Sequence, residues 1–352
     1  MSERRTNILG WLTLIAVLAA IWVMFGEGRQ TSSIGRGEPL VAGLKDRVEQ
    51  TRKITLTKAS ESLTIVANGS DWQIKERSNY TADASKVRGL LRSLALSERR
   101  EPKTSNSARL ERIGLGADAL HIALYDEEGN SLTSLKVGNQ RTGADGHSHA
   151  YVHLDGETKS WLVTSVPALD LDIANWVTNT IISINPERIK KIAFDLSEGV
   201  DYALIREKQG ADFGLNDIKA GEKSVEGYSL GEAASLIANL TFLDVRKSVD
   251  GGLVHTAVSV STFDGLLINI TLKKYGEELW VSTQARYDIA VAEEGSAGEI
   301  YGAPADGKLE ADLYGDRHAG WQYRLKNSDL TTQTRDRDAY LDKDETNLTD
   351  TP

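Results

Sequence analysis

Residues 62–94 decide the fold: SLTIVANGSDWQIKERSNYTADASKVRGLLRSL. Short runs of alternating apolar and polar residues flank Asn68-Gly69, a dipeptide typical of the type I′ turn that joins two antiparallel strands. After the second strand, four apolar residues follow the i, i+3, i+4, i+7 spacing of one helix face: Val87, Leu90, Leu91 and Leu94. The segment therefore predicts an antiparallel hairpin followed by one amphipathic helix.

The same order of elements recurs in the second half of the chain. In each half a hairpin precedes the helix, another follows it, and a tryptophan-bearing strand closes the copy, at Trp161 and at Trp280. The apolar positions of the second helix stand 146 residues after those of the first: Ala233, Leu236, Ile237 and Leu240. Four corresponding elements in one order predict an internal duplication. The expected fold class is α+β, with two similar domains, each a mainly antiparallel sheet with one principal helix packed on it.

Residues 7–26, NILGWLTLIAVLAAIWVMFG, form a long apolar stretch. No charged residue occurs between Ile8 and Phe25, so about 18 positions can cross the hydrocarbon core, near the lower end of what a spanning helix needs. Arg4 and Arg5 precede the stretch, and the positive-inside bias then places the N-terminus in the cytoplasm. We expect a retained single-pass anchor, with the bulk of the chain outside the cytoplasm.

A cleaved signal peptide is the alternative interpretation of this stretch. Val17-Leu18-Ala19 offers a small-residue cleavage site after a shorter apolar core. Cleavage there would leave a strongly apolar segment at the start of the mature chain, which favours the anchor. Lipoprotein processing is excluded because the chain has no cysteine.

One face of the expected anchor helix carries its candidate contacts. Trp11 and Trp22 stand about three helical turns apart and therefore share a face. We assign contact with the membrane or with a partner helix to four residues: Trp11, Leu14, Leu18 and Trp22. Lipid-facing anchoring at the membrane interface is an equal explanation for the two tryptophans.

The remaining boundaries follow from composition and patterning. Trp321 to Leu325 is expected to be a last edge strand of the second domain. The expected order is a cytoplasmic stub and anchor at 1–26, a flexible stalk at 27–47, the first repeat at 48–165, a joining helix at 166–180, the second repeat with a C-terminal extension at 181–330, and a disordered tail at 331–352.

Charge and cysteine content limit the classes of function. Residues 1–26 hold two basic and one acidic side chain of the 41 and 51 in the chain, which leaves 39 basic, 50 acidic and a net charge of −11. This balance argues against nucleic acid or anionic lipid headgroups as the main ligand of the exported part. The absence of cysteine excludes a disulfide scaffold and a thiol nucleophile.

A histidine cluster, His147, His149 and His153, is the main candidate for metal chemistry. Two ligands at i and i+2 on a strand point to the same face, so zinc or copper binding is geometrically possible. The neighbouring loop at 143–146 favours solvated turn histidines instead. Phosphate-binding glycine loops and a Gly-x-Ser-x-Gly elbow do not occur. We therefore assign no catalytic or cofactor-binding residue, expect no cofactor, and keep these histidines as weak metal candidates.

Several spaced motifs carry a resemblance to a known family. Besides Trp72 and the first helix, they are Tyr80-Thr-Ala-Asp83, Arg112-Ile-Gly-Leu115, Leu135-Lys-Val-Gly138 and Ala150-Tyr-Val152. The chain resembles the periplasmic domain-of-unknown-function family encoded beside gliding-motility-type ABC exporters in Gram-negative bacteria, over roughly residues 40–330. It departs from the family pattern around residues 143–150, where the loop carries the histidines.

The resemblance implies an accessory subunit that works with an ABC permease, its ATPase and a second large periplasmic subunit. It brings no established catalytic residues to this chain. The alternatives are a stand-alone envelope binding module for polysaccharide, peptidoglycan or lipid, and a metal-assisted envelope hydrolase centred on the three histidines.

Overall fold

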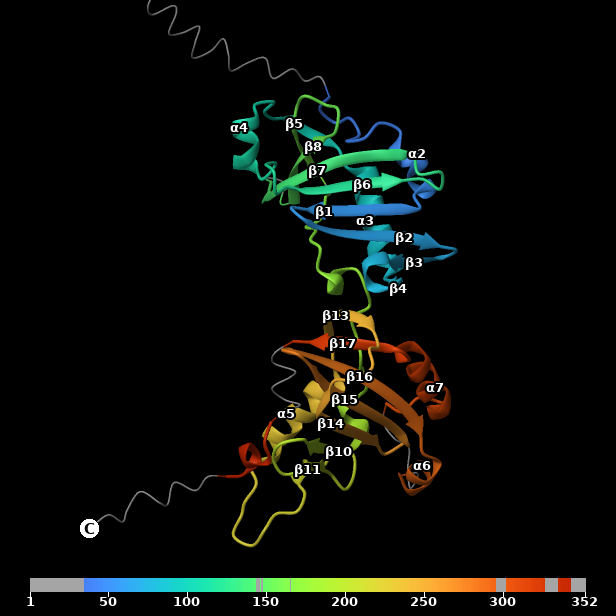
Figure 1. Ribbon diagram of the computed structural model, residues 1–352, viewed down its shortest axis with the longest axis vertical. Coiled ribbons are helices and arrows are strands. Elements are labelled where there is room, and N and C mark those ends of the chain that lie inside the picture. Colours follow the sequence, from blue (N-terminus) through green and yellow to red (C-terminus); the bar gives the residue numbers. More distant parts are fainter. Residues whose placement is uncertain are drawn as a thin grey trace, which may run out of the picture. The chain divides into compact units, whose positions relative to one another are not determined.

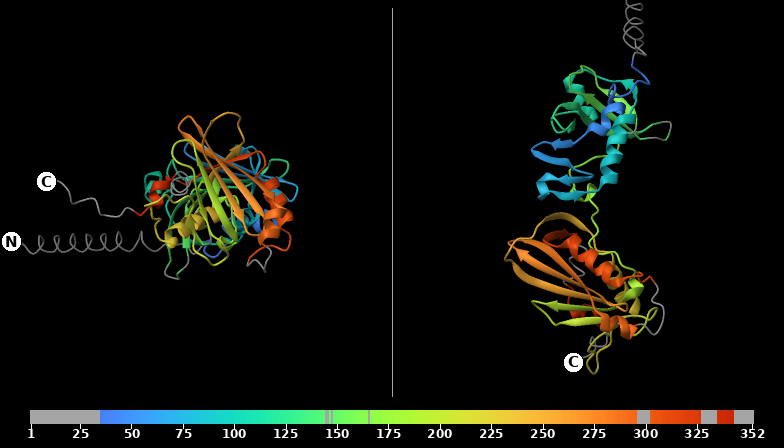
Figure 2. Two further views of the ribbon diagram at one scale, coloured as in Figure 1. Left: turned by 90° about the horizontal axis from the view of Figure 1, so that it is seen from below. Right: turned by 90° about the vertical axis from the view of Figure 1, so that its right-hand side faces the viewer.

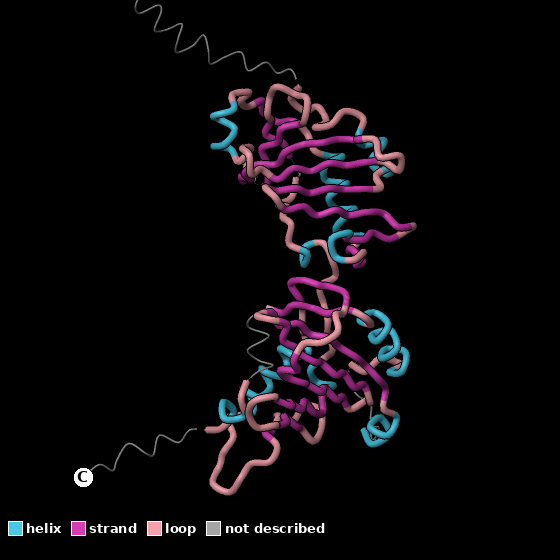
Figure 3. Tube along the Cα trace, in the orientation of Figure 1, coloured by secondary structure: helices cyan, strands magenta, loops and turns pink. Residues whose placement is uncertain are grey.

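The computed structural model describes residues 35–143, 146, 148–164, 166–295, 302–326 and 335–342. They divide into two compact units. The first contains the described residues up to Trp72 together with Ala84–Leu171, and the second contains Gln73–Asp83 and the described residues from Asp172 onward. Two large, mainly antiparallel sheets with a few helices make up the fold, which confirms the expected α+β class at this level (Figures 1 and 3).

The first sheet has nine strands in the order β4-β3-β2-β1-β6-β7-β8-β9-β5. Helix α3 buries its predicted apolar stripe beneath this sheet (Figure 2). The hairpin between β2 and β3 turns at Gly69-Ser70, where only Gly69 has a positive φ, +61°, so the predicted type I′ geometry is wrong. The elements are α2 (Leu44–Arg47), β1 (Lys53–Lys58), β2 (Glu61–Asn68), β3 (Asp71–Ile74), β4 (Tyr80–Ala82), α3 (Ala84–Leu96), β5 (Arg99–Pro102), α4 (Ser107–Leu110), β6 (Leu120–Tyr125), β7 (Ser131–Thr142), β8 (Ser148–Leu154) and β9 (Trp161–Thr164).

The second sheet has eight strands in the order β12-β11-β10-β14-β15-β16-β17-β13. Helix α7 packs against β16 and β15. The elements are β10 (Ile189–Leu196), β11 (Tyr202–Ile205), β12 (Gly214–Leu215), α5 (Gly227–Ala238), β13 (Phe242–Lys247), β14 (Leu253–Thr262), β15 (Leu266–Tyr275), β16 (Glu278–Tyr287), α6 (Ile289–Gly295), α7 (Gly307–His318) and β17 (Trp321–Leu325). Short 3₁₀ helices occur at Val48–Gln50, Lys75–Arg77, Glu111–Ile113, Ile173–Asn175, Pro186–Arg188 and Arg337–Tyr340.

The two sheets share one topology. When strands are matched in chain order, β1 with β10 through β9 with β17, both sheets have the same spatial order, and among the described residues only β4 lacks a counterpart. The principal helix also holds the same place in both, before β5 in the first sheet and before β13 in the second. This correspondence supports the predicted internal duplication.

The match between the two principal helices lies at a different offset from the predicted one. Helix α5 buries residues that each stand 143 positions after a buried residue of α3: Leu230, Ala233, Ala234, Ile237 and Ala238. Leu236, predicted to face inward, is 47% exposed. The predicted offset of 146 was wrong. It differs from 143 by three residues, which is nearly one helical turn, so both alignments place apolar residues on one face. The buried alanines of α5 contribute little to an apolar pattern and did not distinguish the two alignments.

The described part of the expected flexible stalk, residues 35–47, is folded onto the first unit. Its backbone pairs with the edge of β5, since the Gly37 N–H donates to the Arg99 carbonyl at 2.7 Å and the Leu40 N–H donates to the Ser97 carbonyl at 2.7 Å. Leu40 and Leu44 are fully buried. The stalk prediction is therefore wrong for these residues, because two leucines among polar neighbours suffice to hold the segment.

The described part of the expected tail, residues 335–342, is also packed. Arg337 is buried, and its guanidinium lies 2.5 Å from the Glu222 carboxylate. Tyr340 is fully buried, and its carbonyl accepts a hydrogen bond from the Val225 N–H at 2.9 Å. The composition of this segment is polar, but the ion pair of the buried Arg337 with the half-buried Glu222 and one aromatic ring order it, so the prediction of a disordered tail is wrong here.

Two smaller expectations about elements were also wrong. The segment 166–180 contains, among its described residues, only the 3₁₀ turn Ile173–Asn175 instead of a joining helix. Asp170, Asp172 and neighbouring asparagines favour turns over helix interiors because their side chains compete for backbone groups. β17 is not an edge strand, since it pairs with both β13 and β16, and β13 takes the edge.

The expected membrane anchor, including Trp11, Leu14, Leu18 and Trp22, lies outside the described residues. Within the part of the chain that the structure describes, no helix has both the length and the apolar character of a membrane span.

Candidate functional site

Two of the spaced motifs pack against each other in the first unit. A Cβ on Gly138, in β7, would lie 2.3 Å from the Ile113 carbonyl oxygen. Gly114 has a φ of +76°, and a Cβ there would lie 2.3 Å from Oδ1 of Asn139. Only glycine allows this approach at both positions. The two motifs therefore have a structural role, holding the 111–119 loop against the sheet.

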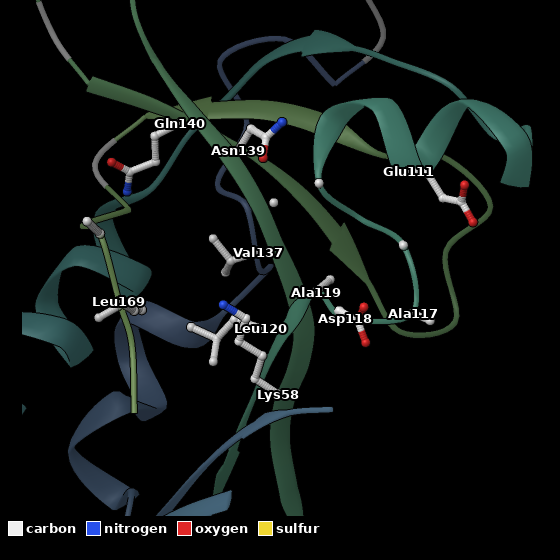
Figure 4. Close-up of a pocket in the computed structure, with 14 residues that line it drawn as sticks. Lys58, Glu111, Ala117, Asp118, Ala119, Leu120, Val137, Asn139, Gln140 and Leu169 are labelled. Atoms are coloured by element: carbon white, nitrogen blue, oxygen red, sulfur yellow. The ribbon is translucent and has the colours of Figure 1, made fainter. Parts of the chain in front are cut away.

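A recess of about 630 Å³ opens beside this contact (Figure 4). Val137, Leu120 and Leu169 form its apolar part, and the polar side chains lie around them. The polar lining consists of Lys58, Glu111, Asp118, Asn139 and Gln140.

The recess is suited to hydrogen bonding. Its lining offers an ammonium, two carboxylates and two amides, and Gln140 is held in place because its Nε2 donates to the Val166 carbonyl at 3.1 Å. The described residues that line it include no hydroxyl, thiol or imidazole that could act as a nucleophile or as the base beside one. This chemistry fits binding of a polar ligand.

Of the predicted histidine cluster, the structure describes His149 and His153, and it does not bring these two together as ligands of one metal ion. His149 and His153 lie on the same face of β8 but four residues apart, which separates them by about 13 Å along the strand. Ligands of one zinc ion each lie about 2 Å from it, so this pair cannot share an ion. His147 lies outside the described residues, and those described contain no group of three or more candidate ligands.

Three exposed apolar residues near the start of β14 were missed from the sequence. They are Val249, Leu253 and Val254, whose exposed fractions are 51%, 79% and 50%, and we call them the β14 patch. Leu253 and Val254 are adjacent apolar residues directly after two glycines, so they break the strand alternation. This break in alternation was the available signal, but two adjacent apolar residues are equally typical of a strand that begins in the core.

The β14 patch stands on a rigid support. The Tyr275 ring covers Gly252 so closely that a Cβ there would lie 2.7 Å from it, and the Tyr275 hydroxyl donates to the Val249 carbonyl at 2.9 Å. The Arg246 guanidinium lies over the rings of Tyr275 and Trp280, at 4.6 and 4.0 Å from their centroids. Leu253 and Val254 are consecutive in β14 and therefore point to opposite faces of the sheet, so each can be covered by a different part of a partner.

A buried histidine makes the second unit sensitive to acid. His318 is almost fully buried, and its Nδ1 lies 2.8 Å from the Tyr323 hydroxyl. Burial lowers the pKa of His318 to about 4, from an unfolded value of about 6.5. The unfolded chain therefore binds more protons between these values, and stability is lost as the pH falls through this window. We expect a loss of about 2 kcal/mol from this group between pH 7 and pH 5, measured by urea unfolding.

His318→Phe is the matched variant for this prediction. It keeps a ring in the site and removes the titrating group, so its stability should change less over the same pH range. Glu222 does not obscure the result, because the hydrogen bond from Arg337 lowers its pKa to about 2 and its contribution is lost only below its unfolded value of 4.5. An equal pH dependence in both proteins would contradict the role of His318.

Comparison with known proteins yields one family. A family model described as Domain of unknown function (DUF4340) matches residues 72–253, just over half of the chain. The matched segment includes α3, both packed glycine motifs and α5. No curated protein and no solved structure gives a significant match.

Proposed function

We propose, from the premise that this chain belongs to the domain-of-unknown-function family DUF4340, that it is a membrane-anchored accessory subunit of an ABC-type export or envelope complex. In this proposal the chain is not itself an enzyme. It acts in the periplasm through protein contacts, and ATP hydrolysis by another chain supplies the energy.

The N-terminal sequence supports the proposed location. Residues 7–26 are long and apolar enough for one crossing of a bacterial inner membrane, and the preceding arginines place the N-terminus in the cytoplasm. The face with Trp11, Leu14, Leu18 and Trp22 would then contact permease helices. The remaining partners are the ATPase and a second large periplasmic subunit, with no role for nucleic acid.

The β14 patch is the observation that carries the proposal of protein contacts. Its three side chains are at least half exposed and stand on a support fixed by Tyr275 and Arg246. Aliphatic groups displayed in this way lose contact with water when a partner covers them, and each buried side chain adds about 1.5–3 kcal/mol of gross hydrophobic stabilisation. A rigid support keeps the ordering entropy of binding low.

Crosslinking of the tagged full-length chain in native membranes, followed by mild solubilisation and mass spectrometry, tests the proposal. We expect a permease and an ATPase in near-stoichiometric amounts. We further expect Leu253→Asp/Val254→Asp to reduce the periplasmic partner recovered by about tenfold or more, because a hot-spot truncation costs about 2 kcal/mol. Circular dichroism of the purified variant checks that it is folded.

Val200→Asp is the control, since Val200 is 54% exposed in the same unit but lies outside the β14 patch. It should recover partners as the unmodified chain does. Absence of the permease and ATPase from the unmodified sample would overturn the assignment to a transporter. Equal recovery with the double variant would remove the β14 patch from the interface.

A second candidate function, a stand-alone envelope binding module for polysaccharide, peptidoglycan or lipid, is favoured by the recess beside Gly114 and Gly138. Its carboxylates and amides match the hydroxyl groups of a glycan. Retention of glycan or lipid through purification, without permease or ATPase, would select this function over the first.

A further inference from the structure

The first unit is fastened to the segment that leads directly from the apolar stretch. Besides the backbone pairing with β5, the Arg99 guanidinium donates to the Leu40 carbonyl at 2.8 Å. The Trp161 ring lies so close to Gly35 that a Cβ there would be 2.8 Å from it. The chain is therefore held against the first unit from Gly35 onward.

The short length of chain before Gly35 limits how far this unit can lie from a membrane. Ten residue steps separate Phe25, the last apolar side chain of the stretch 7–26, from Gly35. Ten steps span at most about 35 Å even when the chain is fully extended. If residues 7–26 cross the bilayer, the β5 edge of the first unit stays within about 35 Å of the lipid surface.

Arg36 and Lys103 lie beside β5, and the charge of Arg141, three strands away on β7, also acts on Glu101. We call these three cations the tether cluster. Lys103 Nζ lies 2.5 Å from the Glu101 carboxylate. The hydrogen bond from Lys103 and the charges of Arg141 and Arg36 outweigh desolvation and lower the pKa of Glu101, so all three cations act on one carboxylate. Arg36 Nε also donates to the Arg100 carbonyl at 2.8 Å, which places the Arg36 side chain beside β5.

The tether cluster has the opposite sign to the chain as a whole. The three cations and Glu101 sum to +2, and the ion pairs Arg100–Glu98 and Arg99–Glu157 add no net charge. Glu38, beside Arg99, lowers the local net charge to +1, whereas the chain carries −10. Arg36 and Arg141 are exposed, so their charges can reach a surface outside the protein. Attraction to anionic headgroups acts within about a Debye length, roughly 8–10 Å, which the tether permits.

We propose that the tether cluster docks the first unit on anionic phospholipid headgroups of the bilayer that holds its own anchor. This inference rests on the proposed membrane anchor and adds to it an orientation, with the β5 edge toward the lipid. It is compatible with the negative charge of the exported part, because only this edge is held near the bilayer by the short tether.

The test uses the full chain reconstituted in vesicles of phosphatidylcholine, alone or mixed with phosphatidylglycerol. The chain has no cysteine, so Ser105→Cys accepts a single donor fluorophore near Lys103, and the acceptor is a headgroup-labelled lipid. We expect higher energy transfer in the anionic vesicles and a decrease at high salt. Replacing the tether cluster with Arg36→Gln, Lys103→Gln and Arg141→Gln should lower the docked-to-undocked ratio about tenfold, or about 1.4 kcal/mol.

The matched control makes the same change of charge on exposed lysines of the second unit, with Lys208→Gln, Lys219→Gln and Lys274→Gln. It should keep the dependence on anionic lipid. Equal transfer in neutral and anionic vesicles, or equal loss in the control, would overturn the docking. Release of the protein from the vesicles by alkaline carbonate would instead show that the anchor itself is absent, which overturns the proposed function and this inference together.

Discussion

Replacing Arg188 with alanine is expected to destabilise the second unit by about 3–5 kcal/mol, because the change leaves two carboxylates facing each other without their cation. Arg188 is 3% exposed. Its guanidinium lies 2.7 Å from Asp264 Oδ2 and 2.6 Å from Glu310 Oε2. Burial alone would lower the pKa of Arg188, but the hydrogen bonds that its guanidinium donates to Glu310 and Asp264 outweigh burial, so this pKa is raised.

The position of Arg188 explains why the effect reaches beyond one contact. Asp264 lies in the turn between β14 and β15, and Glu310 lies on α7. Through these two partners Arg188 joins the start of β10 to the helix that covers β16. Loss of the cation should therefore loosen α7 first, because Glu310 would lose the ion pair that fastens this helix to the start of β10.

Urea unfolding with hydrogen exchange and mass spectrometry measures the Arg188 effect and assigns it to the second unit. Lys274→Ala is the control, since its ion pair with Glu277 is exposed and should be worth less than about 1 kcal/mol. The combined variant Arg188→Met/Asp264→Asn/Glu310→Gln should recover part of the loss by removing the uncompensated charges. A small effect of Arg188→Ala, similar to the control, would contradict this account.

Gly138→Ala is expected to destabilise the first unit by about 3 kcal/mol, the upper part of the range for overpacking. The added methyl group would stand 2.3 Å from the Ile113 carbonyl oxygen, and that neighbour is backbone, which cannot rotate away as a side chain could. Relief requires the 111–119 loop to move from β7. The same movement should change the shape of the recess, because this loop forms part of its wall.

Gly89→Ala provides the matched control for Gly138→Ala. Gly89 lies in the interior of α3, and a Cβ there would have no neighbour within 4 Å. Its replacement should stabilise the unit by about 0.5–1 kcal/mol, because alanine has the higher helix propensity. Chemical denaturation of both variants measures the difference. A neutral Gly138→Ala would show that the loop adapts and that the two motifs do not require close contact.

Local periodicity was enough to predict the α+β class and the repeated order of hairpin, helix and hairpin, but it predicted a helix at 166–180 that does not form and did not predict α7. The stripe of α3 is a property of neighbouring residues, so Val87 and Leu94 could be assigned to one buried face before any long-range contact was known. The hairpins also followed from short signals. The candidate site was predicted less well: His149 and His153 stand apart, and both the recess and the β14 patch were missed.

Periodicity could not decide contacts between residues far apart in the chain. Ala233 fits a helical stripe in two registers, and only packing against the second sheet selects the one that exposes Leu236. Gly138 and Ile113 are distant in sequence, so their contact leaves no local pattern. Likewise, nothing in the polar composition around Arg337 shows that Glu222 will hold it.

The sequence by itself determined the class of fold, the repeat of its elements and the apolar stretch at residues 7–26, because each depends on the spacing of residues along a short piece of chain. The tertiary structure alone decided that Leu40 is buried, that β13 takes the sheet edge and that Leu253 is exposed. These outcomes depend on which segments, distant in sequence, pack against each other, because a side chain is buried only by the residues that contact it.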